Sequence, residues 1–234
     1  MISAANAMPG LSYDVGGHRL HLNCSGSGGP TVVLENGLGE TSPLWSRITE
    51  TVGNDTRVCA HDRAGQGWSG DAPRPQDARQ IAADLHTLLG RAHESGPYVL
   101  VGHSTGGPYA LTYAAQYPTE VAGMVLLDSA SPDQFTVLPD SPGQYATSRR
   151  LTALAPSLAR LGVAHLLPSS SGLPAREAAQ VRAFATTARG LRSIRDEFFV
   201  YPAVFEQAQA LTISGRAIED VIRSVRTGAP LPVR

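Results

Sequence analysis

The chain contains no lysine, since all 19 of its basic side chains apart from histidine are arginines. Functions that need a lysine amine are therefore excluded: phosphate binding by a P-loop, Schiff-base chemistry and the hydrolases with a Ser-x-x-Lys motif. The net charge of −1 provides no general attraction to nucleic acid or to an anionic membrane surface. We therefore expect neither as a partner.

Cysteine and long apolar runs are also scarce. Cys24 and Cys59 are the only cysteines, too few for a disulfide framework, so two small buried thiols in a reduced protein are expected. No apolar run approaches the ~20 residues of a membrane span. Residues 1–10 lack the basic region and the apolar core of a signal peptide. Together these absences predict a cytoplasmic protein.

Strand and helix patterns alternate through the first half of the chain. Apolar alternation on both sides of Gly16 and Gly17 predicts a β-hairpin. The elements expected after it are strand 31–35, helix 43–52, strand 57–60, a loop at 61–76, helix 77–92, strand 98–101, helix 105–117 and strand 121–127. This order predicts an α/β fold, with helices on both faces of a mostly parallel sheet that has an antiparallel start.

From residue 129 the strand pattern stops. Residues 129–143 form a proline-rich segment that predicts a loop, and helices are expected at about 144–161, 176–187 and 189–209. We therefore divide the chain into a core at 1–128, a helical cap at 129–210 and a C-terminal remnant of the core at 211–234.

The most informative motif is Gly102-His103-Ser104-Thr105-Gly106, between a predicted strand and a predicted helix. This arrangement is the sequence form of a nucleophile elbow, which holds a serine on a sharp, strained turn. Gly102 and Gly106 flank Ser104 because a larger side chain at either position would collide with the crossing strand and helix. The free amides at the start of the helix favour negative charge near the serine. Ser104 is the predicted nucleophile.

Three motifs together resemble the α/β-hydrolase family, in its large group of esterases, lipases and haloperoxidase-like proteins. They are the elbow with its following Gly107, the loop Asp62-Arg63-Ala64-Gly65-Gln66-Gly67-Trp68-Ser69, and Glu35-Asn36-Gly37-Leu38-Gly39 in the place of the family's His-Gly oxyanion loop. The resemblance implies an α/β-hydrolase fold and the hydrolysis of a small ester-like substrate. It implies no metal and no organic cofactor.

The resemblance also implies an oxyanion hole. The attacked carbonyl oxygen becomes an anion in acyl transfer and needs preorganised donors, here the backbone amides of Leu38 and Thr105. Asn36 replaces a histidine that the family often has, which matters little if the donor is backbone. A plain turn is the alternative interpretation of Gly37 and Gly39.

In the family, the catalytic acid and histidine follow the nucleophile, and here both are hard to find. No histidine follows His165, and residues 211–234 are too few for two more strands with their helices. The chain is therefore expected to lack strands 7 and 8 of the family. Asp128, after strand 121–127, is a candidate acid, although a structural aspartate at a strand end is the simpler interpretation. His165 is a candidate base, against an ordinary histidine between helices.

Two neighbours of these motifs are expected to be structural. Asp62 and Arg63 predict an ion pair that shapes a loop beside the site, rather than a catalytic acid. His103 predicts a packed side chain, because adjacent residues of an elbow point to different sides.

Two functions are open at this point. The first is a serine hydrolase that cleaves an ester bond through Ser104. The second is a truncated, inactive relative that at most binds a small apolar ligand. In both, the loss of strands 7 and 8 would leave strand 121–127 at a sheet edge, which predicts self-association.

Overall fold

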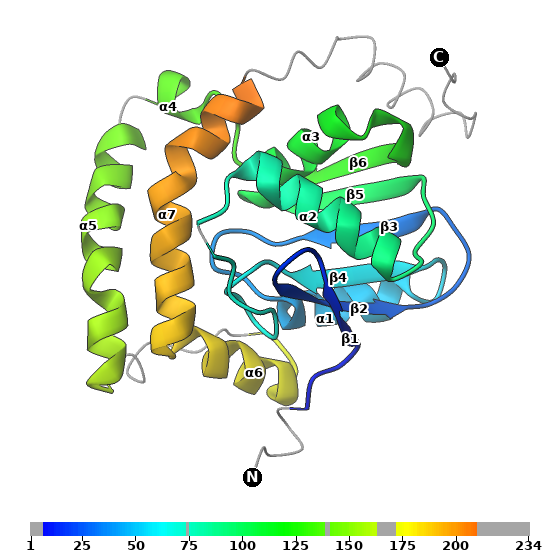
Figure 1. Ribbon diagram of the computed structural model, residues 1–234, viewed down its shortest axis with the longest axis horizontal. Helices are drawn as coiled ribbons and strands as arrows, with labels where there is room; N and C mark the ends of the chain where they lie inside the picture. Colours follow the sequence, from blue (N-terminus) through cyan, green and yellow to red (C-terminus); the bar gives the residue numbers. More distant parts are fainter. Residues whose placement is uncertain (1–6, 74, 139–140, 163–171, 210–234) are drawn as a thin grey trace.

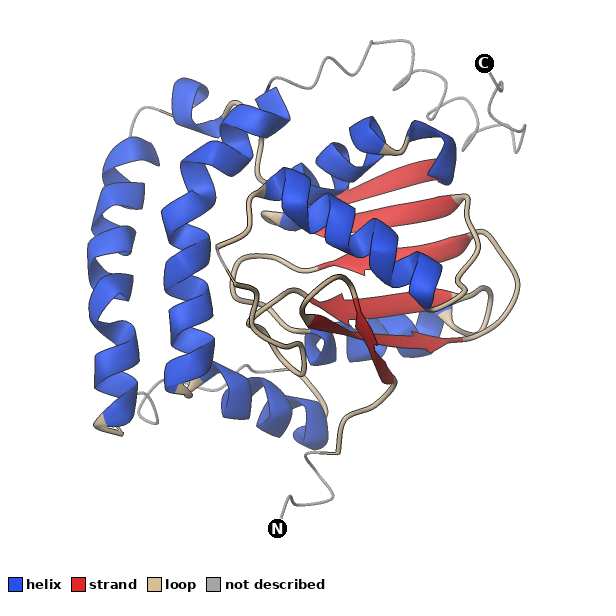
Figure 2. Cartoon of the chain, in the orientation of Figure 1, coloured by secondary structure: helices blue, strands red, loops and turns tan. Residues whose placement is uncertain are grey.

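The computed structural model describes residues 7–73, 75–138, 141–162 and 172–209. Within these residues a single sheet has the strand order β1-β2-β4-β3-β5-β6 (Figures 1 and 2). The strands are β1 (Leu11–Asp14), β2 (Arg19–Ser25), β3 (Thr31–Glu35), β4 (Val58–Asp62), β5 (Tyr98–His103) and β6 (Val121–Leu127). The helices of the first half are η2 (Ser42–Trp45), α1 (Ser46–Val52), α2 (Ala78–Arg91), α3 (Gly106–Gln116) and η3 (Pro118–Glu120).

The sheet is antiparallel at one end and parallel elsewhere. β1 pairs antiparallel with β2, and β2 pairs antiparallel with β4. The remaining pairs, β3 with β4, β3 with β5 and β5 with β6, are all parallel. The predicted α/β architecture with an antiparallel start is therefore confirmed.

Both faces of the central strands are covered because successive side chains of a strand point to opposite faces. On one face Val33 and Leu100 pack with α2 and α3 in the main apolar core. On the other face Leu34 and Val101 pack with Trp45 of η2. This double burial explains why β3 and β5 read as continuous apolar runs.

Helix α2 forms where an N-cap and an apolar stripe coincide. The Asp77 side chain accepts a hydrogen bond from the Gln80 amide at 2.9 Å, as an N-cap does. Ile81, Leu85 and Leu88 are buried on the face that meets the sheet and the neighbouring helices. The predicted cap residue and buried face are both present.

The helices after residue 128 stand beside the sheet. They are α4 (Gln134–Val137), α5 (Ser141–Arg160), α6 (Ala175–Ala185) and α7 (Ala188–Gln209), and α5 and α7 lie side by side (Figure 1). Val204 of α7 packs with Ile81 of α2 and Tyr109 of α3, which joins α7 to the core. The segment 129–143 was expected to be loop, but it contains α4 and the start of α5. His165 and residues 211–234 lie outside the described residues.

Strand β6 is the last strand of the described sheet. Its first residue is buried, but Val125, Leu126 and Leu127 are 45%, 46% and 36% exposed. We expected all of β6 to be buried, but only its first residues are. No described strand pairs with β6 on the side away from β5. No helix in the described ranges has the length and hydropathy needed to cross a membrane.

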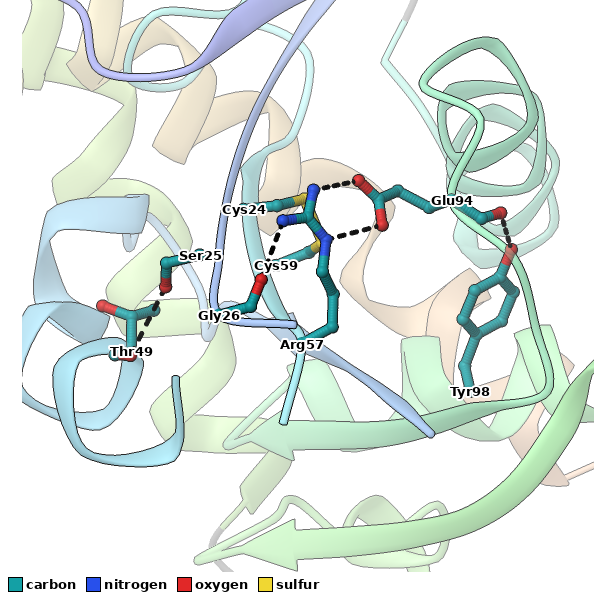
Figure 3. The surroundings of a disulfide bond; sticks show 8 residues. All are labelled: Cys24, Ser25, Gly26, Thr49, Arg57, Cys59, Glu94 and Tyr98. Atoms are coloured by element: carbon teal, nitrogen blue, oxygen red, sulfur yellow. Dashed lines mark hydrogen bonds and ion pairs between the residues drawn. A yellow bond between two sulfur atoms is a disulfide. The ribbon is translucent and has the colours of Figure 1, made fainter. Parts of the chain in front are cut away.

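The expectation of two free thiols is wrong, because Cys24 and Cys59 form a disulfide (Figure 3). The two residues are direct partners in the antiparallel register of β2 and β4, with Cα atoms 4.0 Å apart. Counting cysteines could not reveal this pair, because the pairing depends on strand register. With the two cysteines bonded, free thiols give no reason to expect a cytoplasmic location.

Candidate active site

Ser104 occupies the turn between β5 and α3 and has a φ of 52°. This left-handed conformation is strained for a residue with a side chain. The turn is held by its backbone, since Ser104 N donates to Leu127 O at 3.2 Å and Ser104 O accepts from Ala130 N at 2.9 Å. Strand β6 thus anchors the turn on which Ser104 stands.

The two glycines around Ser104 allow strand and helix to cross closely. A Cβ at Gly102 would lie 2.6 Å from the carbonyl carbon of Gly106. A Cβ at Gly106 would lie 2.4 Å from the carbonyl oxygen of Glu35. Both contacts are with backbone atoms, which cannot rotate away. The strand and helix therefore leave no room for a side chain at either position.

In the loop after β3, the amide of Leu38 has no protein acceptor among the described residues, unlike those of its neighbours Gly37 and Gly39. Gly37 N donates to Glu40 Oε2 at 2.7 Å, and Gly39 N donates to Glu197 Oε2 at 2.7 Å. Glu40 N donates to Gly37 O at 3.2 Å. Within the described ranges the amide of Leu38 has no such partner, and neither has the amide of Thr105 at the start of α3.

Arg63 is buried and makes several of the polar contacts around this loop. It donates to the carbonyl oxygens of Asn36 and Gly37, each at 2.7 Å. It also forms an ion pair with Glu197 of α7 at 2.8 Å and lies 3.5 Å from Glu35. Burial alone would lower the pKa of Arg63, but Glu197, Tyr109 and Glu35 raise it above its usual value. Arg63 therefore stays charged.

The predicted ion pair between Asp62 and Arg63 is wrong, because each has other partners. The buried Asp62 carboxylate accepts from the Ser42 amide at 2.7 Å and lies 3.0 Å from Nδ1 of His21. The Trp68 amide donates to it as well, at 3.1 Å. Asp62 therefore ties the loop after β4 to β2 and η2, which keeps the expected structural role.

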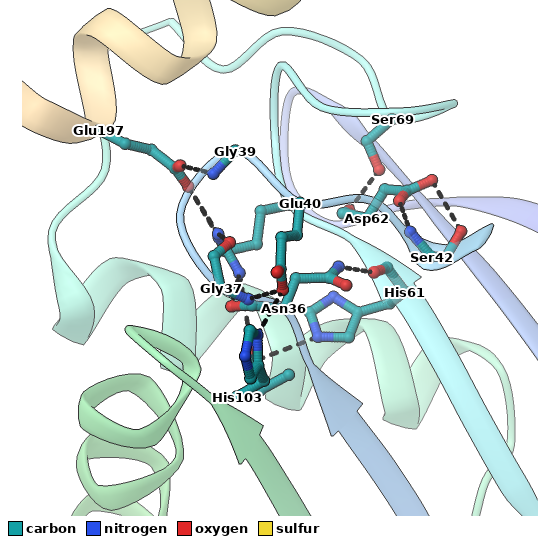
Figure 4. Close-up of polar contacts among 12 residues, drawn as sticks. Asn36, Gly37, Gly39, Glu40, Ser42, His61, Asp62, Ser69, His103 and Glu197 are labelled. Atoms are coloured by element: carbon teal, nitrogen blue, oxygen red, sulfur yellow. Dashed lines mark hydrogen bonds and ion pairs between the residues drawn. The ribbon is translucent and has the colours of Figure 1, made fainter. Parts of the chain in front are cut away.

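His103 is less packed than expected. Its side chain is 37% exposed, and Nδ1 lies 2.9 Å from Glu40 Oε2. Because Glu40 also accepts the Gly37 amide, His103 is linked to the loop through one carboxylate. In Figure 4, His103 points towards Gly37 and Glu40.

Asn36 is buried and joins β3 to its surroundings. Its Nδ2 donates to His61 O at 2.7 Å, and its Oδ1 accepts from Trp45 Nε1 at 2.7 Å. Both side-chain groups are thus used in holding the start of the loop. Asn36 supports the backbone of the site and offers no free group to it.

Asp128, the candidate acid, makes no hydrogen bond to Ser104 in the described structure. Asp128 follows β6, is exposed and has a φ of 43°. Among the described residues no side chain hydrogen-bonds to the Ser104 hydroxyl, and Asp128 makes no ion pair. His165 belongs to the part that is not described.

Cavities lie where α6 and α7 meet the core loops. One of about 200 Å³ lies between α7 and the loop after β4, and its lining includes Arg63, Arg192 and Glu197. A smaller one of about 30 Å³ is bounded by Gly39 and Gly67 of the core loops and by side chains of α6 and α7, namely Val181, Phe184, Ala185 and Ile194. Ser104 lines neither of them.

One group of side chains in the described ranges has the residue types and spacing of metal ligands: Cys24, Cys59 and Glu94. The two sulfurs are bonded to each other, and Glu94 is paired with Arg57 (Figure 3). None of the three lies in the elbow or in the loop after β3. The site is therefore built from backbone amides, a hydroxyl and charged side chains.

Two residues of this site were missed by the sequence analysis. Glu40 directly follows the Gly37-Leu38-Gly39 turn. A carboxylate so close to three backbone amides could have been predicted to accept a hydrogen bond from one of them. Glu197 lies 158 residues beyond Gly39, and no local pattern links the two.

The geometry of the elbow and its neighbouring loop can be compared with known proteins. The family model described as alpha/beta hydrolase fold matches residues 30–191, more than half of the chain. The chain belongs to the α/β-hydrolase family. The matched region of this α/β hydrolase begins just before β3 and ends within α7, so it includes the elbow and the segment α4–α6.

The chain is also similar to individual proteins. An uncharacterised protein of Schizosaccharomyces pombe is 34% identical over 195 residues, which cover 70% of this chain and 36% of that protein. Lipase LipV of Mycobacterium tuberculosis is 38% identical over 115 residues, which cover 47% of this chain and 42% of the lipase. The chain therefore spans less than half the length of either protein.

The crystal structure of Cfl2 from Burkholderia cenocepacia superposes with a TM-score of 0.67 at 27% sequence identity. The superposition covers 85% of this chain and 71% of Cfl2. The fold assigned from the motifs is thus found again in a solved structure.

Proposed function

We propose that this α/β hydrolase cleaves the ester bond of a small substrate, with Ser104 as the nucleophile. The observation that carries the proposal is the conformation of Ser104, a strained residue at a strand-to-helix turn between two glycines. Such a turn presents a serine hydroxyl above the sheet for attack on a carbonyl carbon. The strain costs stability, and its presence at this residue favours a functional role.

The amides of Leu38 and Thr105 are the proposed oxyanion donors. Both lack an acceptor among the described residues, while their neighbours Gly37 and Gly39 have one. An N–H left without an acceptor in a partly buried loop is costly unless a ligand or water meets it. In the proposed reaction, the carbonyl oxygen receives hydrogen bonds from both amides as it becomes an anion.

The similarity to a lipase over 115 residues supports an ester as the substrate class. Asp128 is retained as the proposed acid, because it directly follows β6. The elbow directly follows β5, so both lie at the carboxyl ends of neighbouring parallel strands.

The test is turnover of p-nitrophenyl acetate and p-nitrophenyl butyrate by the purified chain. The proposal predicts hydrolysis of both esters that is lost in Ser104→Ala. Ser157→Ala is the matched control, because Ser157 is exposed on α5 and has no described side-chain partner. Circular dichroism would establish that each variant is folded.

A second function, binding of a small apolar ligand without catalysis, is favoured by one observation. Within the described ranges no base reaches the Ser104 hydroxyl, and a serine without a base is a weak nucleophile. A folded wild-type chain that turns over neither ester would support this second function. Loss of activity in each of the single variants Asp128→Asn and Ser104→Ala would support the first function.

A further inference from the structure

We propose that Glu197 of helix α7 positions the Leu38 amide, so that packing of this helix on the core sets the geometry of the oxyanion hole. The inference rests on the proposed function, since it takes Leu38 N–H as an oxyanion donor. Glu197 is distant in sequence, yet its carboxylate accepts from Gly39 N at 2.7 Å and from Arg63 at 2.8 and 3.0 Å. Its side chain is only 11% exposed.

Arg63 fixes the peptide group that precedes Leu38. It donates through Nη2 to Gly37 O at 2.7 Å. The bond between Gly37 and Leu38 is not one of the cis bonds of the chain, and in a trans peptide the C=O and N–H groups point in opposite directions. Because Arg63 holds the carbonyl oxygen, the Leu38 N–H is directed away from the guanidinium group.

Glu197 fixes the peptide group that follows Leu38. It accepts the Gly39 amide, and Gly39 adopts a φ of +66° against the side chain of Ile194. A Cβ at Gly39 would lie 2.6 Å from Cγ1 of Ile194, so α7 packs directly on this glycine. The direction of the Leu38 amide is therefore determined by Arg63 from the core and Glu197 from α7.

Arg63 limits the negative charge that Glu197 brings to the loop. A lone carboxylate beside the loop would oppose a developing negative charge. Nε and Nη2 of Arg63 both donate to Oε1 of Glu197, and this carboxylate raises the pKa of Arg63 in spite of burial. The pair therefore supplies rigidity without adding a negative field.

The variants that test this inference are Glu197→Ala and Glu197→Gln, with Glu206→Gln as the matched control. Glu206 lies on the same helix, is exposed and has no ion pair in the described ranges. Glutamine keeps an oxygen that can accept from Gly39 but loses the charge that Arg63 needs. Glu197→Ala removes both contacts.

The first measurement is amide hydrogen exchange of Gly39, whose amide donates to Glu197, and it needs no activity. We expect exchange at least about tenfold faster in Glu197→Ala, an intermediate effect in Glu197→Gln and no change in Glu206→Gln. Unchanged exchange in folded Glu197→Ala would overturn the inference.

The second measurement is the labelling of Ser104 by a fluorophosphonate, resolved into the inactivation rate and the inhibition constant of the probe. We expect the rate to fall about tenfold in Glu197→Ala and to recover partly in Glu197→Gln, with little change in the inhibition constant. A general loss of stability would not separate the two constants in this way. Wild-type labelling in Glu197→Ala would overturn the inference, whereas no labelling of the wild type would contradict the proposed function and leave the exchange result to decide the role of Glu197.

Discussion

The residues around Ser104 are restricted by backbone atoms more than by side chains. Gly106 faces the carbonyl oxygen of Glu35, and Gly102 faces Gly106 itself. A side chain at either position must move a strand against a helix. The glycines of this motif therefore allow β5 and α3 to pack closely, and they also hold Ser104 on its turn.

Gly106→Ala should lower the free energy of unfolding by about 1–3 kcal/mol, because the new Cβ overlaps with Glu35 O. The control is Gly90→Ala in α2, where a Cβ would meet no atom within 4 Å. This control should be neutral or stabilising by about 0.5–1 kcal/mol, since alanine favours helix. Urea unfolding of both variants checks the prediction, and equal effects would contradict it.

Asp62 should make stability depend on pH in acid. Burial acts to raise its pKa, but the hydrogen bond and charge of His21 and the amides of Ser42 and Trp68 hold the pKa below its usual value of 3.8. The ionised carboxylate thus stabilises the fold above about pH 4, and this contribution is lost as pH falls through the lowered pKa.

Asp62→Asn should cost about 3 kcal/mol at pH 7 and weaken the acid dependence of stability. Asp55→Asn is the control, because Asp55 is exposed and its side chain has no described contact. Urea unfolding at pH 7, 5 and 3.5 measures both. If Asp62→Asn loses as much stability as the wild type between pH 5 and 3.5, Asp62 is not the group responsible.

At the scale of elements, the disulfide joins β2 to β4 at a position where the sheet changes from antiparallel to parallel. A bond that closes 35 residues should stabilise the fold by about 3–4 kcal/mol on a chain-entropy estimate. We expect the urea midpoint to fall on adding dithiothreitol. The double variant Cys24→Ser, Cys59→Ser should have the urea midpoint of the reduced protein, and dithiothreitol should not change that midpoint. A wild-type midpoint that does not respond would contradict the assignment.

The sequence predicted elements well where one local pattern determines each of them. Asp77 with an apolar stripe predicted α2, and the turn residues Gly16 and Gly17 predicted the β-hairpin. Contacts that depend on tertiary structure were not predicted. The Cys24–Cys59 bond depends on strand register, and the Glu197 contact with Gly39 depends on where α7 packs.

The mistaken Asp62–Arg63 pair has a similar cause. Neighbouring opposite charges suggest a pair in sequence, but consecutive residues at a strand end point in different directions. Asp62 therefore meets His21 of β2, and Arg63 meets Glu197 of α7. Asp62 and Arg63 thus hold the loop in place, as expected, but each does so through a partner that was not predicted.

At the scale of the whole molecule, the exposed end of β6 should cause association. An apolar edge strand offers unpaired amides and carbonyls to another chain. We expect the mass measured by analytical ultracentrifugation to rise with concentration, and Val125→Glu to reduce this rise. Leu154→Glu is the control, because Leu154 is 65% exposed on α5 and remote from the edge in sequence. A monomer at all concentrations that melts cooperatively would contradict the expectation.

The central claim is that Ser104 is a reactive nucleophile. Intact-mass spectrometry of the folded chain after exposure to a fluorophosphonate tests it most directly, with Ser104→Ala and Ser157→Ala treated in parallel. We expect one adduct per chain, located on Ser104 by peptide mapping, present in Ser157→Ala and absent in Ser104→Ala. A folded chain that gains no adduct, or an adduct that persists in Ser104→Ala, would contradict it.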